Sequence, residues 1–161
     1  VRCEPPRRVL YCVPRGSGMD HVEYVYTAGM DRSDIDARLR AGEHGVLGLA
    51  DGNDAYAVPL SYDYDGDRFL LRVSAHDDDG EKGRFLSATD TATFVCHAAS
   101  THESWSIQIR GPLRRLDDDV DEATLNERFQ PFRLFDEPVE AVEFVVYELE
   151  MATVAGRSTV E

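Results

Sequence analysis

The strongest constraint on the fold is a period of two in the hydrophobic pattern between residues 44 and 75. Such a period places alternate side chains on opposite faces of a sheet, so it predicts strands. Gly52 and Gly66, each preceded by an aspartate, mark two tight turns within the stretch. The chain therefore predicts an antiparallel meander of three strands, HGVLGLA (44–50), AYAVPLSYDYD (55–65) and RFLLRVSA (68–75).

Three further segments continue the strand pattern toward the carboxyl end, namely TATFVCHA (91–98), SWSIQIRGPLRRL (104–116) and AVEFVVYELEMATVAGRS (141–158). Six antiparallel strands in one small domain favour closure, because closure removes exposed strand edges. The predicted fold is mainly β with short helices, and its six strands form a barrel.

Three short helices interrupt the strands. Asp31 or Ser33 can cap the first helix, and Gly42 after its end offers a left-handed stop. The last helix has acidic residues at its amino end, where the helix dipole favours them. The three helices are predicted at about residues 32–41, 81–88 and within 117–132.

The first 18 residues differ in composition from the rest of the chain. They carry four arginines against one glutamate, a charge of +3, which leaves −17 for residues 19–161. Arg7 and Arg8 resemble a twin-arginine export signal, but the apolar stretch after them ends at Pro14, short of the roughly 7 to 15 residues that export requires. We interpret residues 1–18 as a disordered extension, or as translated sequence before a true start at Met19, and residues 19–161 as one domain.

The net charge of −14 limits the possible partners. Acidic residues outnumber basic ones 31 to 17, which argues against nonspecific binding to nucleic acid. An acidic surface with one lysine is typical of adaptation to high salt, as in a halophile. The three cysteines lack a CxxC pair or a disulfide framework, and no run approaches the roughly 20 apolar residues of a membrane span. We expect a cytoplasmic protein that does not enter a membrane.

Lys82, the single lysine, indicates a candidate anion site. It stands with Arg84 in GEKGRFL, where a helix is predicted to begin. Helix amides and nearby cations together suit a phosphate. The alternative is an ordinary surface ion pair between Lys82 and Glu81 or a nearby aspartate.

Several other patterns point only weakly to chemistry. His76 begins HDDDG, which could bind a metal but is more typical of a solvated turn. SYDYDGD imitates a calcium loop, yet Arg72 stands where the bidentate glutamate is required. Cys96 and His97 should point to opposite faces of their strand, and His102 follows in a loop. No metal site is predicted, and neither a GxSxG nor a GxGxxG motif occurs.

Three segments taken together resemble a known family. YAVPLSY, LLRVSAHDDDGEKGRFL and SWSIQIRG are similar to the FMN-binding split barrel of the pyridoxamine 5′-phosphate oxidase-like superfamily, with the nitroimidazole-resistance-like branch as the nearest type. The resemblance runs from about Ile35 to Leu116 and continues in the order of elements. It implies a six-stranded antiparallel split β-barrel, a homodimer with FMN at the interface, and flavin-mediated oxidoreduction of a small molecule.

The resemblance also implies roles for individual residues. The isoalloxazine ring would lie along YAVPLSY, and the ribityl chain and phosphate would lie at LLRVSAHDDDGEKGRFL. SWSIQIRG of the partner subunit would approach the flavin across the dimer interface. Trp105, alternatively, is an ordinary core residue. The implied cofactor-binding residues are Val58, Pro59, Leu60 and Ser61, then Arg72, Val73 and Ser74, then Lys82 and Arg84, and finally Trp105 and Ser106.

Two departures from the family leave the reaction and the catalytic residues open. Near the carboxyl end only Arg157 is available to hold a substrate, and Arg72 stands where the nitroimidazole-resistance branch usually has histidine. The alternatives are a deazaflavin-dependent reductase, a haem-binding or haem-degrading relative with His76 or His97 as axial ligand, and a non-catalytic flavin carrier or sensor.

Overall fold

The computed structural model describes residues 11–12, 24–25, 27–74, 80–116, 127–129 and 144–159. The two-residue strands β1 (Tyr11–Cys12) and β2 (Tyr24–Val25) pair with each other. The interpretation of residues 1–18 as an extension stays a prediction. The predicted third helix and the HDDD run fall largely or wholly outside the described residues.

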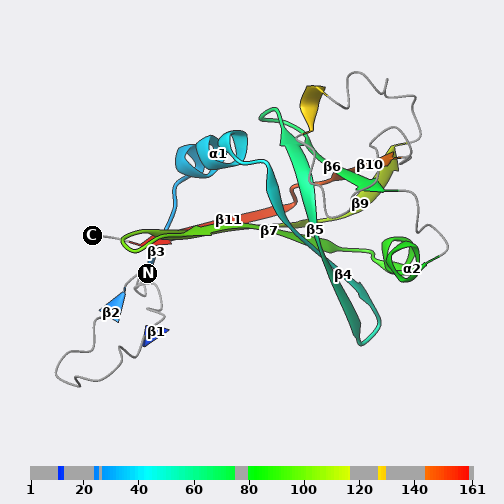
Figure 1. The fold of residues 1–161 in the computed structure, drawn as a ribbon, viewed down its shortest axis with the longest axis horizontal. Coiled ribbons are helices and arrows are strands. Elements are labelled where there is room, and N and C mark those ends of the chain that lie inside the picture. The colour runs from blue at the N-terminus through cyan, green and yellow to red at the C-terminus, as the bar shows by residue number, and fades with distance from the viewer. Residues whose placement is uncertain are drawn as a thin grey trace, which may run out of the picture.

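The remaining strands form one antiparallel sheet of nine, in the order β3-β11-β8-β7-β4-β5-β6-β10-β9 (Figure 1). The mainly β fold with short helices is thereby confirmed. Within the described residues β3 and β9 stand at the two ends of this order, so the sheet is not a closed barrel. The strands are β3 (Thr27–Gly29), β4 (His44–Asp51), β5 (Asp54–Tyr64), β6 (Phe69–Ser74), β7 (Ala92–Ala99), β8 (Ser104–Gly111), β9 (Leu113–Leu116), β10 (Phe144–Leu149) and β11 (Thr153–Thr159).

The count of nine strands rather than six has a local cause. Each of the two longest predicted strands divides, giving β8 and β9 from one and β10 and β11 from the other, and β3 is added. At the division Gly111 and Pro112 face the three residues 150–152 of the neighbouring strand, an arrangement typical of a β-bulge. Pro112 has no amide hydrogen to donate, and a Cβ on Gly111 would overlap the carbonyl oxygen of Glu150.

Strand β5 divides the sheet into two halves. Its residues 54–61 pair with β4, and its residues 62–64 pair with β6. The first half therefore comprises β3, β11, β8, β7, β4 and β5, and the second comprises β5, β6, β10 and β9. This arrangement agrees with the predicted split architecture.

The main core lies between these halves and is rich in aromatic rings. Phe69 and Phe94 are fully buried, with ring centroids 5.2 Å apart in an edge-to-face contact. Helix α1 (Arg32–Ala41) adds Ile35 and Leu39, while α2 (Glu81–Ala88) adds Phe85. A smaller cluster of Leu70, Phe129 and Val146 lies on the other face of β6.

The helix boundaries agree with the predictions, but the reason for the glycine after α1 does not. The Asp31 carboxylate accepts a hydrogen bond from the amide of Asp34 at 2.8 Å, as predicted for a cap. Gly42 has φ −90° and ψ 160°, which is extended, so the predicted left-handed stop is wrong. Glycine is needed there for space, because a Cβ would overlap the hydroxyl of Tyr62, which donates to the carbonyl oxygen of Leu39 at 3.0 Å.

Neither described helix is long and apolar enough to cross a membrane.

Candidate functional site

The candidate site centres on a contact between Lys82 and Ser74. Lys82 lies in the first turn of α2 and is only 9% exposed, and its Nζ donates to the Ser74 hydroxyl at 2.8 Å. Ser74 is the last residue of β6. The structure thus brings together two of the predicted phosphate-binding residues, one from a strand end and one from the next helix.

The amino end of α2 adds further hydrogen-bond donors beside this pair. The first amides of a helix have no acceptor within the helix, and the helix dipole gives this end a partial positive charge. Gly80 stands at the cap position and has no side chain with which to accept from these amides. The helix start, Lys82 and Ser74 therefore form a donor set of the kind that binds phosphate.

Arg72 adds a second cation on the same side of β6. It precedes Ser74 by two residues, so both side chains point to the same face. The guanidinium of Arg72 lies 3.6 Å from the centroid of the Phe144 ring, and Phe144 is paired with Ser74 in the adjacent strand. Cation–π stacking orients this guanidinium. Val73, between them, points into the main core and is 2% exposed.

The other predicted strand segment lies where β5 and β6 separate. Pairing of these strands ends at Tyr62 and Leu71. Beyond that point Pro59 and Ser61 point away from the main core, whereas Val58 and Leu60 pack against it. Pro59 is exposed and Ser61 is buried. The segment thus lies beyond the point at which β5 and β6 stop pairing, as Arg72 and Ser74 do.

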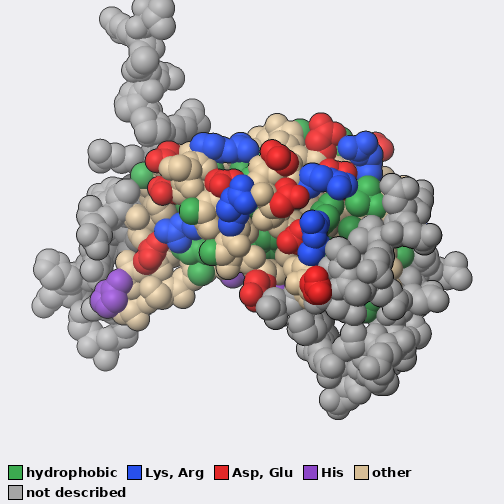
Figure 2. All heavy atoms as spheres, turned by 90° about the horizontal axis from the view of Figure 1, so that it is seen from above, with side chains coloured by type: hydrophobic (Ala, Val, Ile, Leu, Met, Phe, Trp, Pro, Cys, Tyr) green, Lys and Arg blue, Asp and Glu red, His purple; other side chains and the backbone are tan. Residues whose placement is uncertain are grey.

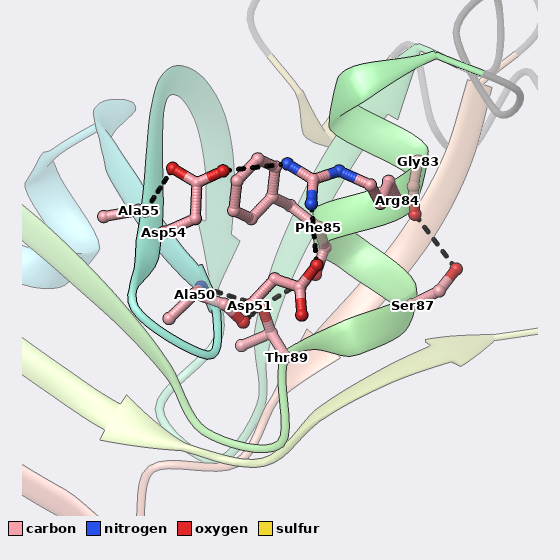
Figure 3. Close-up of polar contacts among 9 residues, drawn as sticks. All are labelled: Ala50, Asp51, Asp54, Ala55, Gly83, Arg84, Phe85, Ser87 and Thr89. Atoms are coloured by element: carbon pink, nitrogen blue, oxygen red, sulfur yellow. Dashed lines mark hydrogen bonds and ion pairs between the residues drawn. The ribbon is translucent and has the colours of Figure 1, made fainter.

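Arg84 does not join Lys82. Its guanidinium donates to the carboxylates of Asp51 at 2.7 Å and Asp54 at 3.0 Å, in the turn between β4 and β5 (Figure 3). The hydrogen bond with Asp54 first, and then the negative charge of Asp51, raise the pKa of Arg84. The guanidinium also lies over the ring of Phe85. Arg84 therefore fastens α2 to the β4–β5 hairpin.

Thr89 fastens the other end of α2 to the same hairpin (Figure 3). Its hydroxyl donates to the carbonyl of Phe85 at 2.7 Å and accepts from the amide of Ala50 at 3.0 Å. With Arg84 this gives the helix two attachments. The helix that presents Lys82 is therefore held in a defined position.

Trp105 and Ser106 lie far along the sheet from Lys82. Trp105 is opposite Ala98, six residues along β7 from Ala92, which corresponds to about 20 Å of strand. Its ring is partly buried against the main core, with the Arg38 guanidinium 5.0 Å from the ring centroid. Ser106 is exposed on the opposite face. One chain does not bring these residues to Lys82.

The potential metal ligands do not gather in the described part of the chain. Cys96 is buried and His97 is exposed, on opposite faces of β7 as predicted. The described residues contain no group of three or more side chains that could hold a metal ion.

Sequence reasoning missed three partners in this region. Phe144 stacks with Arg72, and Asp51 and Asp54 bind Arg84. The carboxylates lie about thirty positions from Arg84 in the chain, so spacing offered no signal. The position of Asp51 and Asp54 in a tight turn next to two predicted strands was the available clue.

Taken together, the fold and site define a mainly β protein with a divided antiparallel sheet and a helix start that carries a cluster of hydrogen-bond donors. The sequence model of the pyridoxamine 5′-phosphate oxidase family matches residues 31–158, and the chain belongs to this family. No curated protein matches the sequence significantly.

Solved structures share the fold at low sequence identity. A candidate 5-nitroimidazole antibiotic resistance protein of Bacteroides thetaiotaomicron has a TM-score of 0.64 and 17% identity, with 98% of this chain and 96% of that chain covered. An FAD-binding protein of Mesorhizobium loti has a TM-score of 0.62 and 16% identity, with 85% of this chain and 99% of that chain covered. An FAD- and haem-binding protein of Mycobacterium smegmatis has a TM-score of 0.61 and 17% identity, with 84% of this chain and 74% of that chain covered.

Proposed function

We propose that this protein binds a flavin nucleotide through its phosphate, with FMN as the cofactor. The observation that carries the proposal is the Lys82–Ser74 contact at the amino end of α2. A buried ammonium is poorly screened by salt, so a phosphate beside it is held more strongly than at an exposed site. Family membership and the FAD-binding proteins among the structural neighbours support a flavin cofactor, and the choice of FMN is part of the proposal.

The remaining predicted residues fit this assignment in different ways. Arg72 stands on the same face as Ser74 and adds positive charge, and the ring system would lie beside Pro59 and Ser61, beyond the point at which β5 and β6 stop pairing. Arg84 acts as a positioning residue that holds α2 in place. When bound, the flavin supplies the redox chemistry, and the protein binds and orients it.

The flavin site requires a homodimer in this proposal. Trp105 and Ser106 lie at the other end of β7 and β8 from α2 within one chain. A second copy would bring its own Trp105 and Ser106 to the flavin.

The reaction proposed is oxidoreduction of a small molecule in the cytoplasm. The lack of a disulfide framework favours a reducing compartment. Consumption of reduced nicotinamide with trial acceptors separates an enzyme from a flavin carrier. Absorption spectra of the purified protein separate flavin from deazaflavin and haem.

The decisive experiment compares FMN with riboflavin, which lacks the phosphate. Lys82→Met removes the charge and keeps most of the packing volume. We expect it to weaken FMN about ten- to hundredfold, because a charge-assisted hydrogen bond contributes about 1.5–3 kcal/mol. Riboflavin affinity should change little. FAD also carries phosphate, so Lys82→Met should weaken FAD binding as much as FMN binding if Lys82 and Ser74 contact only the phosphate.

The matched control is Arg84→Ala. Its two ion pairs are half-exposed and contribute about 0–1 kcal/mol, so FMN and riboflavin affinities should fall together and slightly. Equal losses for both ligands in Lys82→Met, or no flavin binding by the wild type, would contradict the proposal.

A further inference from the structure

Phe144 begins β10 with a large aromatic ring that lies outside the hydrophobic clusters of the described residues. The side chain is partly buried, yet it belongs neither to the main core nor to the smaller cluster of Leu70, Phe129 and Val146. Core packing is the ordinary reason for an aromatic residue in a strand. The ring of Phe144 instead lies against the guanidinium of Arg72, whose Cζ is 3.6 Å from the ring centroid.

Strand register explains how the ring reaches Arg72. Phe144 is paired with Ser74, and Val146 is paired with Arg72 two positions along the same two strands. Phe144 and Arg72 are therefore diagonal neighbours on one face of the sheet, a separation of about 7–8 Å that an aromatic ring and an arginine can span together. Because the pairing holds both backbones, the stack joins two fixed strands.

The stack stands beside the contact between Lys82 and Ser74. Ser74 is opposite Phe144 in the neighbouring strand, and its hydroxyl accepts a hydrogen bond from the Nζ of Lys82 at 2.8 Å. Arg72 precedes Ser74 by two residues and points to the same side of β6. Phe144 is therefore next to one of the predicted phosphate-binding residues in the sheet and in contact with another.

An aromatic ring holds a guanidinium differently from a carboxylate. Acidic and basic side chains are interspersed on the face drawn in Figure 2. Arg40 pairs with Asp36 and Arg68 pairs with Glu148. A carboxylate fastens an arginine, but it offsets the positive charge and repels a phosphate brought to the same place. An aromatic face attracts the cation through its quadrupole and carries no net charge, so the cation keeps its attraction for an anion.

Stacking also orders the guanidinium without covering its edge. The five N–H donors of an arginine lie in the plane of the group, whereas a stacked ring covers one face of that plane. The Nε of Arg72 is buried, so the protein encloses the base of the guanidinium. A guanidinium that is already ordered loses less conformational entropy when an anion binds.

We propose that Phe144 is a positioning residue, whose ring holds the Arg72 guanidinium in place to bind the flavin phosphate beside Lys82. This role rests on the proposed function, because it belongs to the same phosphate site. Phe144 acts through Arg72 and does not itself touch the flavin. Affinity for a flavin that carries phosphate should therefore depend on the ring of Phe144, and affinity for riboflavin should not.

The test compares FMN and riboflavin affinities in Phe144→Leu, which keeps an apolar side chain and removes the ring. We expect the dissociation constant for FMN to rise about three- to tenfold and that for riboflavin to stay unchanged. Phe144→Tyr keeps an aromatic face and should bind FMN like the wild type. Val145→Ala is the matched control, because Val145 packs against the main core and any loosening of β10 should affect both ligands alike. Circular dichroism shows whether each variant is folded.

A double-mutant cycle separates an action through Arg72 from a direct contact with the flavin. Arg72→Met removes the guanidinium and keeps most of the length of the side chain. In that background Phe144→Leu should have no further effect on FMN affinity, because there is no guanidinium left to hold. If Phe144→Leu weakens FMN binding equally with and without Arg72, the positioning role is refuted.

The stack also has a signature that requires no flavin. A ring 3.6 Å from the Arg72 Cζ shifts the NMR resonances of that side chain upfield through its ring current. The shift should persist in Phe144→Tyr and disappear in Phe144→Leu. An unshifted Arg72 signal in the wild type, or equal losses of FMN and riboflavin affinity in Phe144→Leu, would overturn the proposal.

The same measurements distinguish this inference from the proposed function. FMN binding that depends on Lys82 but not on Phe144 would refute the role of Phe144 alone. A wild type that shows the ring-current shift but binds no flavin would refute the proposed function, and the role of Phe144 at a flavin phosphate with it.

Discussion

At the scale of single residues, the thiol of Cys96 illustrates how the core controls reactivity. Cys96 is 2% exposed. Burial raises its pKa to about 11, and a hydrogen bond with Tyr62 opposes that shift only in part. Since the thiolate is the reactive form, Cys96 should be inert near neutral pH.

This predicts slow labelling of Cys96 in the native protein. With Cys3 and Cys12 replaced by serine, a thiol reagent at pH 8 should react only as fast as the protein opens, and fully in denaturant. Absorbance of the released product measures the rate. Labelling at the rate of a small free thiol would mean that Cys96 is accessible.

Lys82 and Arg84 show at the same scale that neighbouring cations can serve different purposes. Lys82 is buried and donates to a strand-end hydroxyl, whereas Arg84 is half-exposed and binds two turn carboxylates. One helical turn presents both side chains, and the direction in which each points decides its role.

At the scale of elements, the junction between α1 and β4 depends on a close approach. The Tyr62 hydroxyl donates to the last turn of α1 and occupies the space where a Cβ on Gly42 would lie. The backbone of Gly42 is otherwise unstrained, so only packing forbids a side chain there.

Gly42→Ala should therefore destabilise the protein by about 1–3 kcal/mol, as overpacking typically does. Gly29→Ala is the matched control, because a Cβ at Gly29 has no neighbour within 4 Å. Loss of backbone entropy in the unfolded chain should leave that variant unchanged or slightly more stable. Urea denaturation measures the free energy of unfolding of both variants. Equal values would show that the Tyr62 hydroxyl moves aside without loss of stability.

At the scale of the whole molecule, several carboxylates make the fold sensitive to acid. Hydrogen bonds from backbone amides lower the pKa of Asp65. Hydrogen bonds from Asp34 and then Ser33 lower the pKa of Asp31, and one from Arg40 lowers that of Asp36. A hydrogen bond from Arg68 lowers the pKa of Glu148. Burial raises the pKa of Asp63, the one described carboxylate with the opposite shift. A lowered folded pKa stabilises the fold above the ordinary values of 3.8 and 4.5.

The melting temperature should thus stay level from neutral pH to about 5 and fall as the pH drops below about 4. The measurement belongs in about 1 M salt, where loss of the net negative charge has little effect of its own. Asp65→Asn keeps an acceptor for its turn amides but does not titrate, so its profile should be flatter. A melting temperature that rises between pH 4 and 3 would contradict this account.

The sequence by itself determined the elements and one key residue. The period of two and the Asp-Gly turns are local properties, so β4, β5 and β6 were predictable, as were α1 and α2. Lys82 was found because it is the single lysine and stands at the start of a predicted helix, and the structure brings it into contact with Ser74.

Only the tertiary structure decided what depends on distance in space. The partners of Arg84 lie on a hairpin about thirty residues earlier, and chain spacing does not encode which carboxylate a flexible guanidinium reaches. The two longest predicted strands divide because β8 pairs with β11 before Pro112 and β9 pairs with β10 after it. That change of pairing requires both chain segments to be in place. Strand register acts in the same way, because it brings positions that are far apart in the chain onto one surface.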